Sequence, residues 1–425
     1  MKRLLVVANP FPPVASAGTT RLVRFLRHLP EHGWEATVLT TKSSGPADVP
    51  AGVRVLRAPV LMPRRLLGGG PRSKRIHDWV SVPDPYAAWI GPAVVSGRRL
   101  LHDERFDVLL SSQPRPSTHL VAASLARSSG LPWLADYRDP WATYQFRHTP
   151  TAAHRGAHLR LEAWALERAA AVTGVNAPIV DDIVARHPWL AGRAHVLPNG
   201  FDRDEVAEPV TLGDGFWLVH TGRLYGREQQ VSAFLTGLAA LPPEVKALFV
   251  GVAEDRVLPE ARRLGLGERV RVEPLVPHGR ALGYQRAAGA LLLVNGRRPE
   301  SMSSKVFEYL QAGRPIFAIS PAGSAARTLF DQVGGAVCVL PDEPMAAPLA
   351  GFVTAVRQRV APAADPTALE RYELGRLTAE LAAILDGLRA GPEAWRAGPT
   401  GARGTPGDAE PGTHAGGWPD GTMSR

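Results

Sequence analysis

Cysteine is almost absent from this sequence, and so are long apolar runs. Cys338 is the only cysteine among 425 residues, so no intrachain disulfide can form and a cysteine-rich zinc site is excluded. We therefore expect a reducing, cytoplasmic setting. Nowhere do 18 apolar residues follow one another, so no segment is expected to span a membrane. The first apolar run stops at Asn9 after five residues and predicts a buried strand rather than a signal peptide.

Several catalytic motifs are also missing. The chain has no G-x4-G-K-[ST] phosphate loop, and no G-x-G-x-x-G follows the first expected strand, which argues against a nicotinamide dehydrogenase. It has neither H-E-x-x-H nor a His/Cys cluster, so nothing suggests catalytic zinc. The nucleophile motif G-x-S-x-G is absent as well.

A strong excess of one charge is lacking too. Lys and Arg number 49 against 40 Asp and Glu, a formal charge of +9 carried mainly by scattered arginines, which weakly favours anionic ligands. Aromatic residues make up 7% and are not interleaved with a basic stripe, so we do not expect a nucleic-acid partner. The basic stretch at residues 63–75 predicts a solvated loop, with a peripheral contact to a membrane surface or an anionic acceptor as the alternative.

The pattern that is present is an alternation of short Val- and Leu-rich runs with amphipathic stretches of helix length. Such a rhythm is typical of α/β domains with parallel sheets covered by helices on both faces. The clearest helices are expected at residues 21–29, 120–127 and 159–170. Strands are expected near residues 3–8, 36–41, 53–58, 108–112, 133–136, 171–175, 194–197, 216–220, 246–250, 270–273, 290–294, 316–319 and 336–340.

Two doubly wound domains of similar size follow from this order. We expect a first domain at residues 1–203 and a second at residues 204–390, which begins with a polar linker and ends with a terminal helix. Ligands of open parallel sheets bind outside the carboxyl ends of the strands, so the two domains should face each other across a cleft. Residues 391–425 contain nine Gly and five Pro and are expected to be a disordered tail.

One segment of the second half combines a strand end, a polar loop and a short helix. Ser303 or Ser304 can cap that helix, Lys305 lies in its first turn, and Glu308 follows one turn later. A helix start at a strand's carboxyl end suits a phosphate, and the lysine adds a full positive charge. The alternative is a surface ion pair between Lys305 and Glu308.

This segment resembles the nucleotide-sugar site of the large retaining glycosyltransferase family, often called family 4, that has the GT-B fold and an E-x7-E signature. Glu300 and Glu308 have that spacing, and residues 309–315, Tyr-Leu-Gln-Ala-Gly-Arg-Pro, look like the family's continuation. Three further segments are similar to family landmarks: residues 220–227 at a strand end, Pro-Asn-Gly-Phe-Asp at 198–202, and Asp-Tyr-Arg-Asp-Pro-Trp at 136–141.

The resemblance implies a role for each matching residue in holding a nucleoside diphosphate sugar. The sugar nucleotide is then the substrate, and no separate cofactor and no metal are implied. Glu308 would hold the ribose and Glu300 the sugar, while Gly18, in the first loop, would permit close approach of the first domain. The diphosphate would be held by residues of the second domain: Gly222, Arg223, Arg227, Ser304 and Lys305.

Two departures from the family pattern stand out. Arg223 is followed by Arg227 and Glu228 without the usual lysine, whose charge Lys305 would replace, and Glu300 lacks the usual Gly/Phe pair after it. A loop glutamate that merely faces water is the competing account of Glu300.

His119 and Asp139 complete the candidate list in the first domain. Each follows an expected strand and could face the cleft, His119 to orient a hydroxyl of the sugar or the acceptor. A structural histidine and an internal pair between Arg138 and Asp139 are the alternatives.

The sequence thus predicts a metal-independent glycosyltransferase that moves a sugar from a nucleotide sugar to an acceptor hydroxyl with retention. The acceptor, whether a glycan, a lipid-linked sugar or a small natural product, is not encoded in any pattern that we recognise. A non-hydrolysing nucleotide-sugar epimerase and a non-catalytic partner subunit of the same fold are the alternatives. Asp202-Arg203-Asp204 spells D-x-D but lies in the connection between the domains.

Overall fold

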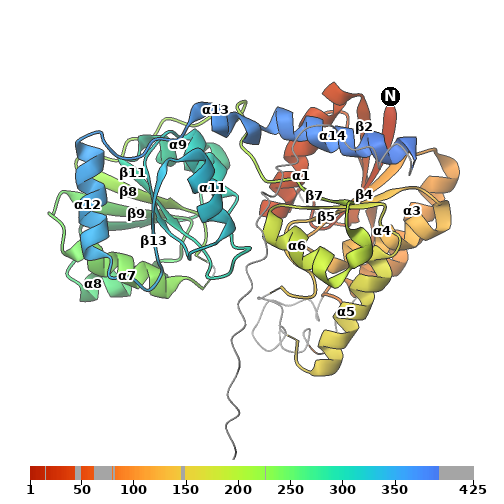
Figure 1. Ribbon diagram of the computed structural model, residues 1–425, viewed down its shortest axis with the longest axis horizontal. Coiled ribbons are helices and arrows are strands. Elements are labelled where there is room, and N and C mark those ends of the chain that lie inside the picture. Colours follow the sequence, from red (N-terminus) through yellow and green to blue (C-terminus); the bar gives the residue numbers. More distant parts are fainter. Residues whose placement is uncertain are drawn as a thin grey trace, which may run out of the picture.

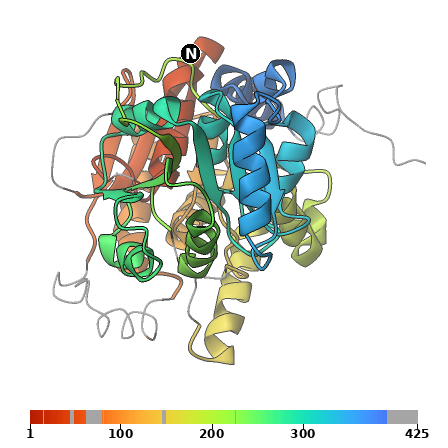
Figure 2. The same cartoon turned by 90° about the vertical axis from the view of Figure 1, so that its left-hand side faces the viewer.

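The chain folds into two α/β domains, each built on an open parallel sheet. The computed structural model describes residues 1–14, 16–43, 49–61, 79, 82–144, 149–224 and 226–391. Figure 1 shows the domains side by side, and Figure 2 looks along the line that joins them, with the second domain in front. The basic stretch at 63–75, Tyr225 and the tail after Gly391 lie outside the described residues.

The first sheet has seven strands in the order β3-β2-β1-β4-β5-β6-β7, and every neighbouring pair is parallel. The order reverses between β1 and β4, the position at which such sheets bind ligands. The strands are β1 (Lys2–Ala8), β2 (Trp34–Thr41), β3 (Arg54–Ala58), β4 (Val108–Ser112), β5 (Trp133–Tyr137), β6 (Ala171–Gly174) and β7 (Ala194–Val196).

The second sheet repeats this design with six parallel strands in the order β10-β9-β8-β11-β12-β13, and its order reverses between β8 and β11. Its strands are β8 (Phe216–Thr221), β9 (Val245–Val250), β10 (Val270–Glu273), β11 (Ala290–Val294), β12 (Ile316–Ile319) and β13 (Ala336–Val339). Every strand expected from the sequence is present. The inner strands are mostly apolar runs buried on both faces, whereas the edge strands β3, β7, β10 and β13 are only partly buried.

Helices cover both faces of the first sheet. Alternate residues of β1 point to opposite faces, so Leu4 and Val6 belong to one core and Leu5 and Val7 to the other. One core packs under α1 (Ala17–His28) and α14 (Leu374–Ala390). The other packs under α3 (Ala87–Asp103), α4 (Pro116–Ser129), α5 (Ala152–Leu166) and α6 (Ala177–Arg186).

The second sheet is covered in the same way. One core packs under α7 (Glu228–Ala239), α8 (Leu258–Arg263) and α12 (Ala346–Arg357). The opposite core packs under α9 (His278–Ala287), α10 (Lys305–Gln311) and α11 (Ala325–Val333), and α13 (Pro366–Leu369) lies beside it. Among the described residues, single turns of 3-10 helix are η1 (Leu29–His32), η3 (Pro188–Leu190), η4 (Glu254–Arg256) and η5 (Glu370–Tyr372).

All three helices expected from the sequence begin earlier than predicted. Helix α4 begins at Pro116 rather than Leu120, without a side-chain cap, and side-chain caps explain the other two starts. Helix α1 begins at Ala17 rather than Arg21, because the Ser16 hydroxyl accepts the backbone N–H of Thr19. Helix α5 begins at Ala152 rather than Leu159, because Thr151 caps it in the same way. In both views α5 projects beyond the rest of its domain.

The terminal helix α14 follows the second sheet in the chain but packs on the first domain. Leu377, Leu381 and Leu385 are buried with β1 and α1 (Figure 1, blue helix over the first domain). Its grouping with the second domain at residues 204–390 therefore needs correction. The apolar stripe of α14 was visible in the sequence. Which domain it packs against depends on where the chain returns from the second domain to the first, and the sequence does not show this.

The crossing itself is tight. The backbone N–H of Phe201 donates to the carbonyl of Tyr372 at 3.1 Å, and the N–H of Leu374 donates to the carbonyl of Phe201 at 3.0 Å. A Cβ on Gly200 would lie 2.2 Å from the Tyr372 carbonyl oxygen, so only glycine fits at this position. No helix in the described ranges is both long and apolar enough to cross a bilayer.

We predict that Gly200→Ala destabilises the protein, because the added methyl group would force the two crossing segments apart. Overpacking of this kind costs about 1 to 3 kcal/mol. Gly351 in α12 is the matched control, since it is exposed, a Cβ there meets nothing within 4 Å and alanine is the better helix former. Thermal unfolding should show a lower melting temperature for Gly200→Ala and an equal or higher one for Gly351→Ala. Equal melting temperatures for both variants would contradict the crossing geometry.

Candidate functional site

The candidate site lies in the second domain, where the loops after β8 and β11 meet the start of α10. The loop after β8 carries Gly222, whose backbone φ of +84° is a left-handed value that favours glycine. A Cβ at this residue would lie 3.1 Å from the Lys305 Nζ. The lysine therefore lies directly against the glycine loop.

Lys305 also contacts the buried ring of His220. The Lys305 Nζ lies 3.4 Å from the His220 Nε2, and the Nδ1 lies 3.0 Å from the Leu292 carbonyl. Burial, helped by the nearby positive charges of Lys305 and Arg227, holds the pKa of His220 well below its usual range. The imidazole is therefore neutral, and it adds no charge beside the lysine.

The electrostatics of Lys305 are unusual for a lysine. Burial and the neighbouring Arg227 guanidinium lower the pKa of Lys305 to about 7, and the Glu308 carboxylate only partly opposes them. A group that titrates near neutrality and faces a glycine loop gains its charge readily when an anion arrives.

Glu308 does not pair with Lys305 on the helix surface. Its Oε1 instead accepts a hydrogen bond from the Arg24 Nη2 at 3.1 Å, and Arg24 comes from α1 of the other domain. The Glu308 side chain is only 12% exposed, and that of Arg24 only 5%. The surface ion pair between Lys305 and Glu308 is thus not what the structure shows.

Arg24 binds a second carboxylate at the same time. Its Nε and Nη2 donate to the two oxygens of Glu205 at 2.8 and 2.6 Å, and the Nε2 of His278 lies 3.0 Å from Glu205. Burial favours the neutral form of Glu205, but hydrogen bonds from His278 and Arg24 prevail and lower its pKa to about 2. The same hydrogen bond raises the pKa of His278. One arginine thus joins α1, the linker and α10.

Buried polar side chains of the second domain lie beside the carboxylate of Glu308. The Gln285 Nε2 donates to the Thr221 Oγ1 at 3.0 Å and lies 3.5 Å from the Glu308 Oε2. The Tyr309 hydroxyl accepts the backbone N–H of Thr221 at 2.8 Å, which joins α10 to the end of β8. These contacts place Glu308 beside the glycine loop.

Glu300 lies at the domain boundary rather than free in water. Its backbone carbonyl accepts the Asn176 Nδ2 of the first domain at 2.9 Å, while its side chain accepts the Arg298 Nε at 2.8 Å. The side chain is 16% exposed. The loop that carries it is therefore held by the other domain.

The remaining expected diphosphate residues differ in their placement. The Arg227 Nη1 donates to the Val294 carbonyl at 2.8 Å, so this arginine bridges the loops after β8 and β11. Arg223 is exposed on the first of these loops. Ser304 precedes α10 without a side-chain capping bond and lines a small pocket together with Arg24 and Gly200.

Gly18 and Asp139 lie close to each other in the first domain. A Cβ on Gly18 would lie 2.8 Å from the Pro114 Cδ and 3.3 Å from the Arg138 Nη1, so the first loop packs tightly on the loops after β4 and β5. The Asp139 carboxylate accepts the Arg138 Nη2 at 2.8 Å. The internal Arg138–Asp139 pair is thus present, and it contributes to that packing.

His119 is enclosed in the core of the first domain and is fully buried. Its Nδ1 lies 2.7 Å from the Ser111 hydroxyl, and its ring packs 4.6 Å from that of Tyr137. Burial, weakly opposed by Asp136, lowers its pKa to about 3. A neutral ring with no exposed surface matches the structural alternative for His119.

A buried ion pair that the sequence analysis did not identify joins the strand ends of the first domain. Asp136 accepts from the Arg21 Nη2 at 3.0 Å and from the hydroxyls of Ser112 and Thr173 at 2.8 Å each. Arg21 also donates to the carbonyl of Pro198 at 2.8 Å. The first aspartate of the Asp-Tyr-Arg-Asp-Pro-Trp segment therefore has a structural task.

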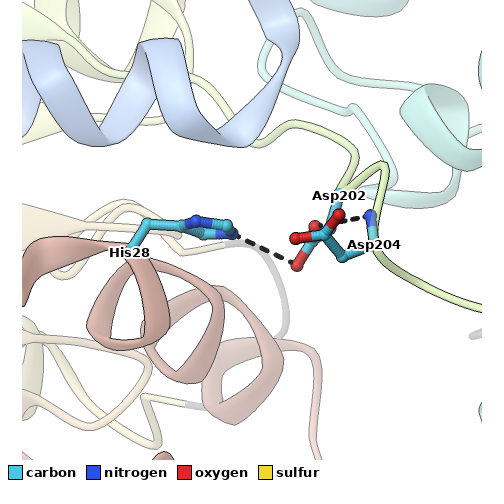
Figure 3. Close-up of side chains that lie close together, drawn as sticks. All are labelled: His28, Asp202 and Asp204. Carbon is cyan, nitrogen blue, oxygen red and sulfur yellow. Dashed lines mark hydrogen bonds and ion pairs between the residues drawn. The ribbon is translucent and has the colours of Figure 1, made fainter. Parts of the chain in front are cut away.

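His28, Asp202 and Asp204 bring together three atoms, all within 4.8 Å of one another, that could hold a metal ion (Figure 3). The Asp202 Oδ2 already accepts the Arg27 Nη1 at 2.9 Å and lies 3.5 Å from the His28 Nε2. Its Oδ1 accepts the backbone N–H of Asp204 at 3.1 Å. Because a guanidinium already neutralises the buried carboxylate, we assign the cluster to the domain junction.

Pattern analysis missed the residues that surround Glu308 and Glu205. Arg24 lies in α1, Glu205 in the linker, and His278 and Gln285 in α9, and no motif marks any of them. The one available signal was Arg24 itself, a positively charged residue between apolar positions of α1.

Comparisons with known proteins bear on the fold and on the first domain. Residues 16–200 match the family described as "Glycosyl transferase 4-like domain". Anabaena HepE, solved with UDP and glucose, is 16% identical, with a TM-score of 0.66 over 91% of this chain and 100% of that chain. Sucrose-phosphate synthase from Thermosynechococcus elongatus is 17% identical, with a TM-score of 0.61 over 93% and 97%.

WaaG, a glycosyltransferase involved in lipopolysaccharide biosynthesis, is 16% identical, with a TM-score of 0.62 over 90% of this chain and 100% of that chain. A comparison with curated protein sequences found no significant match. At these identities, likeness to the solved structures establishes the fold. Residues 16–200 therefore resemble the glycosyl transferase 4-like domain, and the chain as a whole has the GT-B fold.

Proposed function

We propose that this protein is a retaining glycosyltransferase that moves a sugar from a nucleoside diphosphate donor to an acceptor hydroxyl. The observation that carries the proposal is the position of Glu308. Its carboxylate is largely buried beside the glycine loop of β8, one helical turn from Lys305, and Gln285 and Arg24 hold it. A carboxylate in this place can accept hydrogen bonds from both hydroxyls of a ribose.

The diphosphate would lie against the Gly222 loop. Lys305 faces that loop, Arg227 spans it and the loop after β11, and Arg223 is exposed on it. As the bond from the sugar to the diphosphate breaks, both bonding electrons move to the leaving phosphate oxygen. The cations then stabilise the developing negative charge more strongly than they stabilise the ground state. HepE, which has the same fold, was solved in complex with UDP and with UDP-glucose, which supports a nucleotide-sugar ligand for this fold.

The new glycosidic bond would form on the face of the sugar that the diphosphate leaves. The departing phosphate oxygen can itself accept the proton of the acceptor hydroxyl, so the anomeric configuration is retained without a separate strong base. Glu300 lies on the loop that Asn176 holds and would contact the sugar, while Gly18 would allow close approach of the first domain. The acceptor would enter between the domains, from the first-domain side.

The proposal also covers the need for a metal and the cellular location. We propose that Lys305 and the arginines replace the divalent metal that other transferases use at the diphosphate. We also propose a cytoplasmic enzyme, with peripheral contact to a membrane surface if the acceptor is lipid-linked.

The function is tested first by nucleotide binding to Glu308 variants. Calorimetry with UDP, GDP, ADP and dTDP should reveal one nucleotide that binds the wild type. Loss of charge-assisted bonds to the ribose in Glu308→Ala should cost about 1.5 to 3 kcal/mol, or roughly 10- to 150-fold in kcat/KM for the donor. Glu308→Gln retains one acceptor oxygen, so its kcat/KM for the donor should lie between that of the wild type and that of Glu308→Ala.

Both variants should remain folded at the assay temperature, because Arg24 keeps its two hydrogen bonds to Glu205, and the melting temperature should fall more in Glu308→Ala than in Glu308→Gln. An unchanged rate in Glu308→Ala would contradict the proposed site. Binding of no nucleotide by the wild type would favour a non-catalytic partner subunit, and conversion of a sugar nucleotide to its epimer without acceptor would favour an epimerase.

Donor binding should weaken as the pH rises through about 7, where Lys305 of the free protein loses its charge. A bound diphosphate raises the pKa of the lysine, so binding takes up a proton, and the favourable charge is complete only below the free pKa. The dissociation constant of a sugar nucleotide, whose diphosphate diester does not titrate in this range, should rise up to about tenfold between pH 6 and 8.

Lys305→Arg is the control, because a guanidinium stays charged throughout. Its pH dependence should be flatter than that of the wild type. A flat profile in the wild type, or the same slope in Lys305→Arg, would show that Lys305 does not titrate against the donor.

Chelation should leave turnover unchanged. The proposed cations at the diphosphate are side chains, and the carboxylate of Asp202 is already neutralised by Arg27. We expect equal initial rates with and without excess EDTA after extensive dialysis. A large loss of rate that added Mg²⁺ or Mn²⁺ restores would show that the reaction needs a metal.

A further inference from the structure

Arg24 is the residue of the first domain that touches the candidate donor-binding carboxylate. It lies in the second turn of α1, far in the chain from the second domain, and is nearly completely buried. Its Nη2 carries two protons and lies within hydrogen-bond distance of two carboxylates, 2.6 Å from the Glu205 Oε2 and 3.1 Å from the Glu308 Oε1. No motif or family landmark in the sequence marks this residue.

The arrangement leaves the two oxygens of Glu308 in different states. The Oε1 is held by Arg24, whereas the Oε2 has, among the described residues, only the long 3.5 Å contact with Gln285. A carboxylate held at one oxygen keeps its plane and direction, and the other oxygen stays available as an acceptor. A ribose hydroxyl could therefore bind at the Oε2 without displacing the arginine.

Without Arg24, the carboxylates of Glu205 and Glu308 would lie near each other with less positive charge to offset their repulsion. The Glu205 and Glu308 side chains are each 12% exposed, so solvent screens their repulsion poorly. His278 contacts Glu205, but it does not replace the bridge to Glu308. In the described network, the Arg24 guanidinium is thus the group that contacts and neutralises Glu205 and Glu308 at the same time.

We propose that Arg24 is a positioning residue for the donor, which acts through Glu308 by holding its carboxylate in the orientation that accepts the ribose hydroxyls. This inference rests on the proposed function. It adds that the donor site is completed by the first domain, since the residue that directs Glu308 belongs to α1. Binding of the nucleotide ribose is then coupled to the contact between the domains.

The test asks whether the effect of Arg24 depends on the ribose hydroxyls. We would measure dissociation constants of UDP and of 2′,3′-dideoxy-UDP for the wild type and for Arg24→Gln, and use the GDP or ADP pair if the nucleotide panel selects that base. Arg24→Gln should weaken UDP about tenfold or more and weaken the dideoxy analogue twofold at most, because the analogue has no hydroxyl for Glu308 to bind. Such non-additivity is the signature of two groups that act together.

Arg27→Gln is the matched control. Arg27 lies one turn later in α1 and also reaches the linker, through Asp202 at 2.9 Å, but no contact joins it to Glu308. It should affect UDP and the dideoxy analogue equally. Arg24→Lys keeps the charge but cannot bind two carboxylates as a planar fork, so its loss for UDP should be intermediate. This variant also serves if Arg24→Gln does not fold.

Three outcomes would overturn the inference. Equal losses for both nucleotides would give Arg24 a purely structural role, and tighter UDP binding in Arg24→Gln would show that the arginine competes with the ribose. In both cases the proposed function would stand, because the wild type still binds the nucleotide. Failure of the wild type to bind any nucleoside diphosphate would overturn the proposed function and this inference together.

Discussion

The arrangement of the two domains depends on the neutralisation of buried carboxylates where they meet. Glu205 and Glu308 are mostly buried, and a single guanidinium, that of Arg24, contacts both. Asp136 and Asp202 are neutralised in the same way by Arg21 and Arg27. Three arginines on one face of α1 therefore carry the charge that the strand ends and the linker require. A buried carboxylate that loses its partner costs several kcal/mol, so this face of α1 can change little.

The same constraint shapes the candidate donor site. Lys305 is close to Arg227 and to a neutral His220, and a fully charged lysine is unfavourable there until an anion arrives. Glu308 could have neutralised it, but Glu308 is directed toward Arg24 of the first domain. The site thus has unsatisfied positive potential at the glycine loop and a fixed acceptor one helical turn away. That combination matches the two ends of a nucleoside diphosphate, its phosphates and its ribose.

Much of the fold was predictable from the sequence, and the reason is local. Apolar runs such as residues 290–294 are buried on both faces of a parallel sheet, so their composition alone indicates strands. The loop and helix at residues 300–308 were predictable because strand and helix signals follow one another, although the expected cap by the Ser304 side chain does not form. The start of α5 was missed, because a stretch that begins with Ala and His carries a weak apolar pattern and its Thr151 cap was overlooked.

Features that depend on distant contacts were not predictable. The core position of His119, the packing of α14 on the first domain and the partner of Glu308 are decided by tertiary structure. A crystal structure with a bound sugar nucleotide tests the central claim most directly. Our account predicts that Glu308 accepts the ribose hydroxyls within hydrogen-bond distance while its Oε1 keeps the contact with Arg24, and that Lys305 contacts the diphosphate. A nucleotide bound elsewhere, or with its ribose directed away from Glu308, would contradict it.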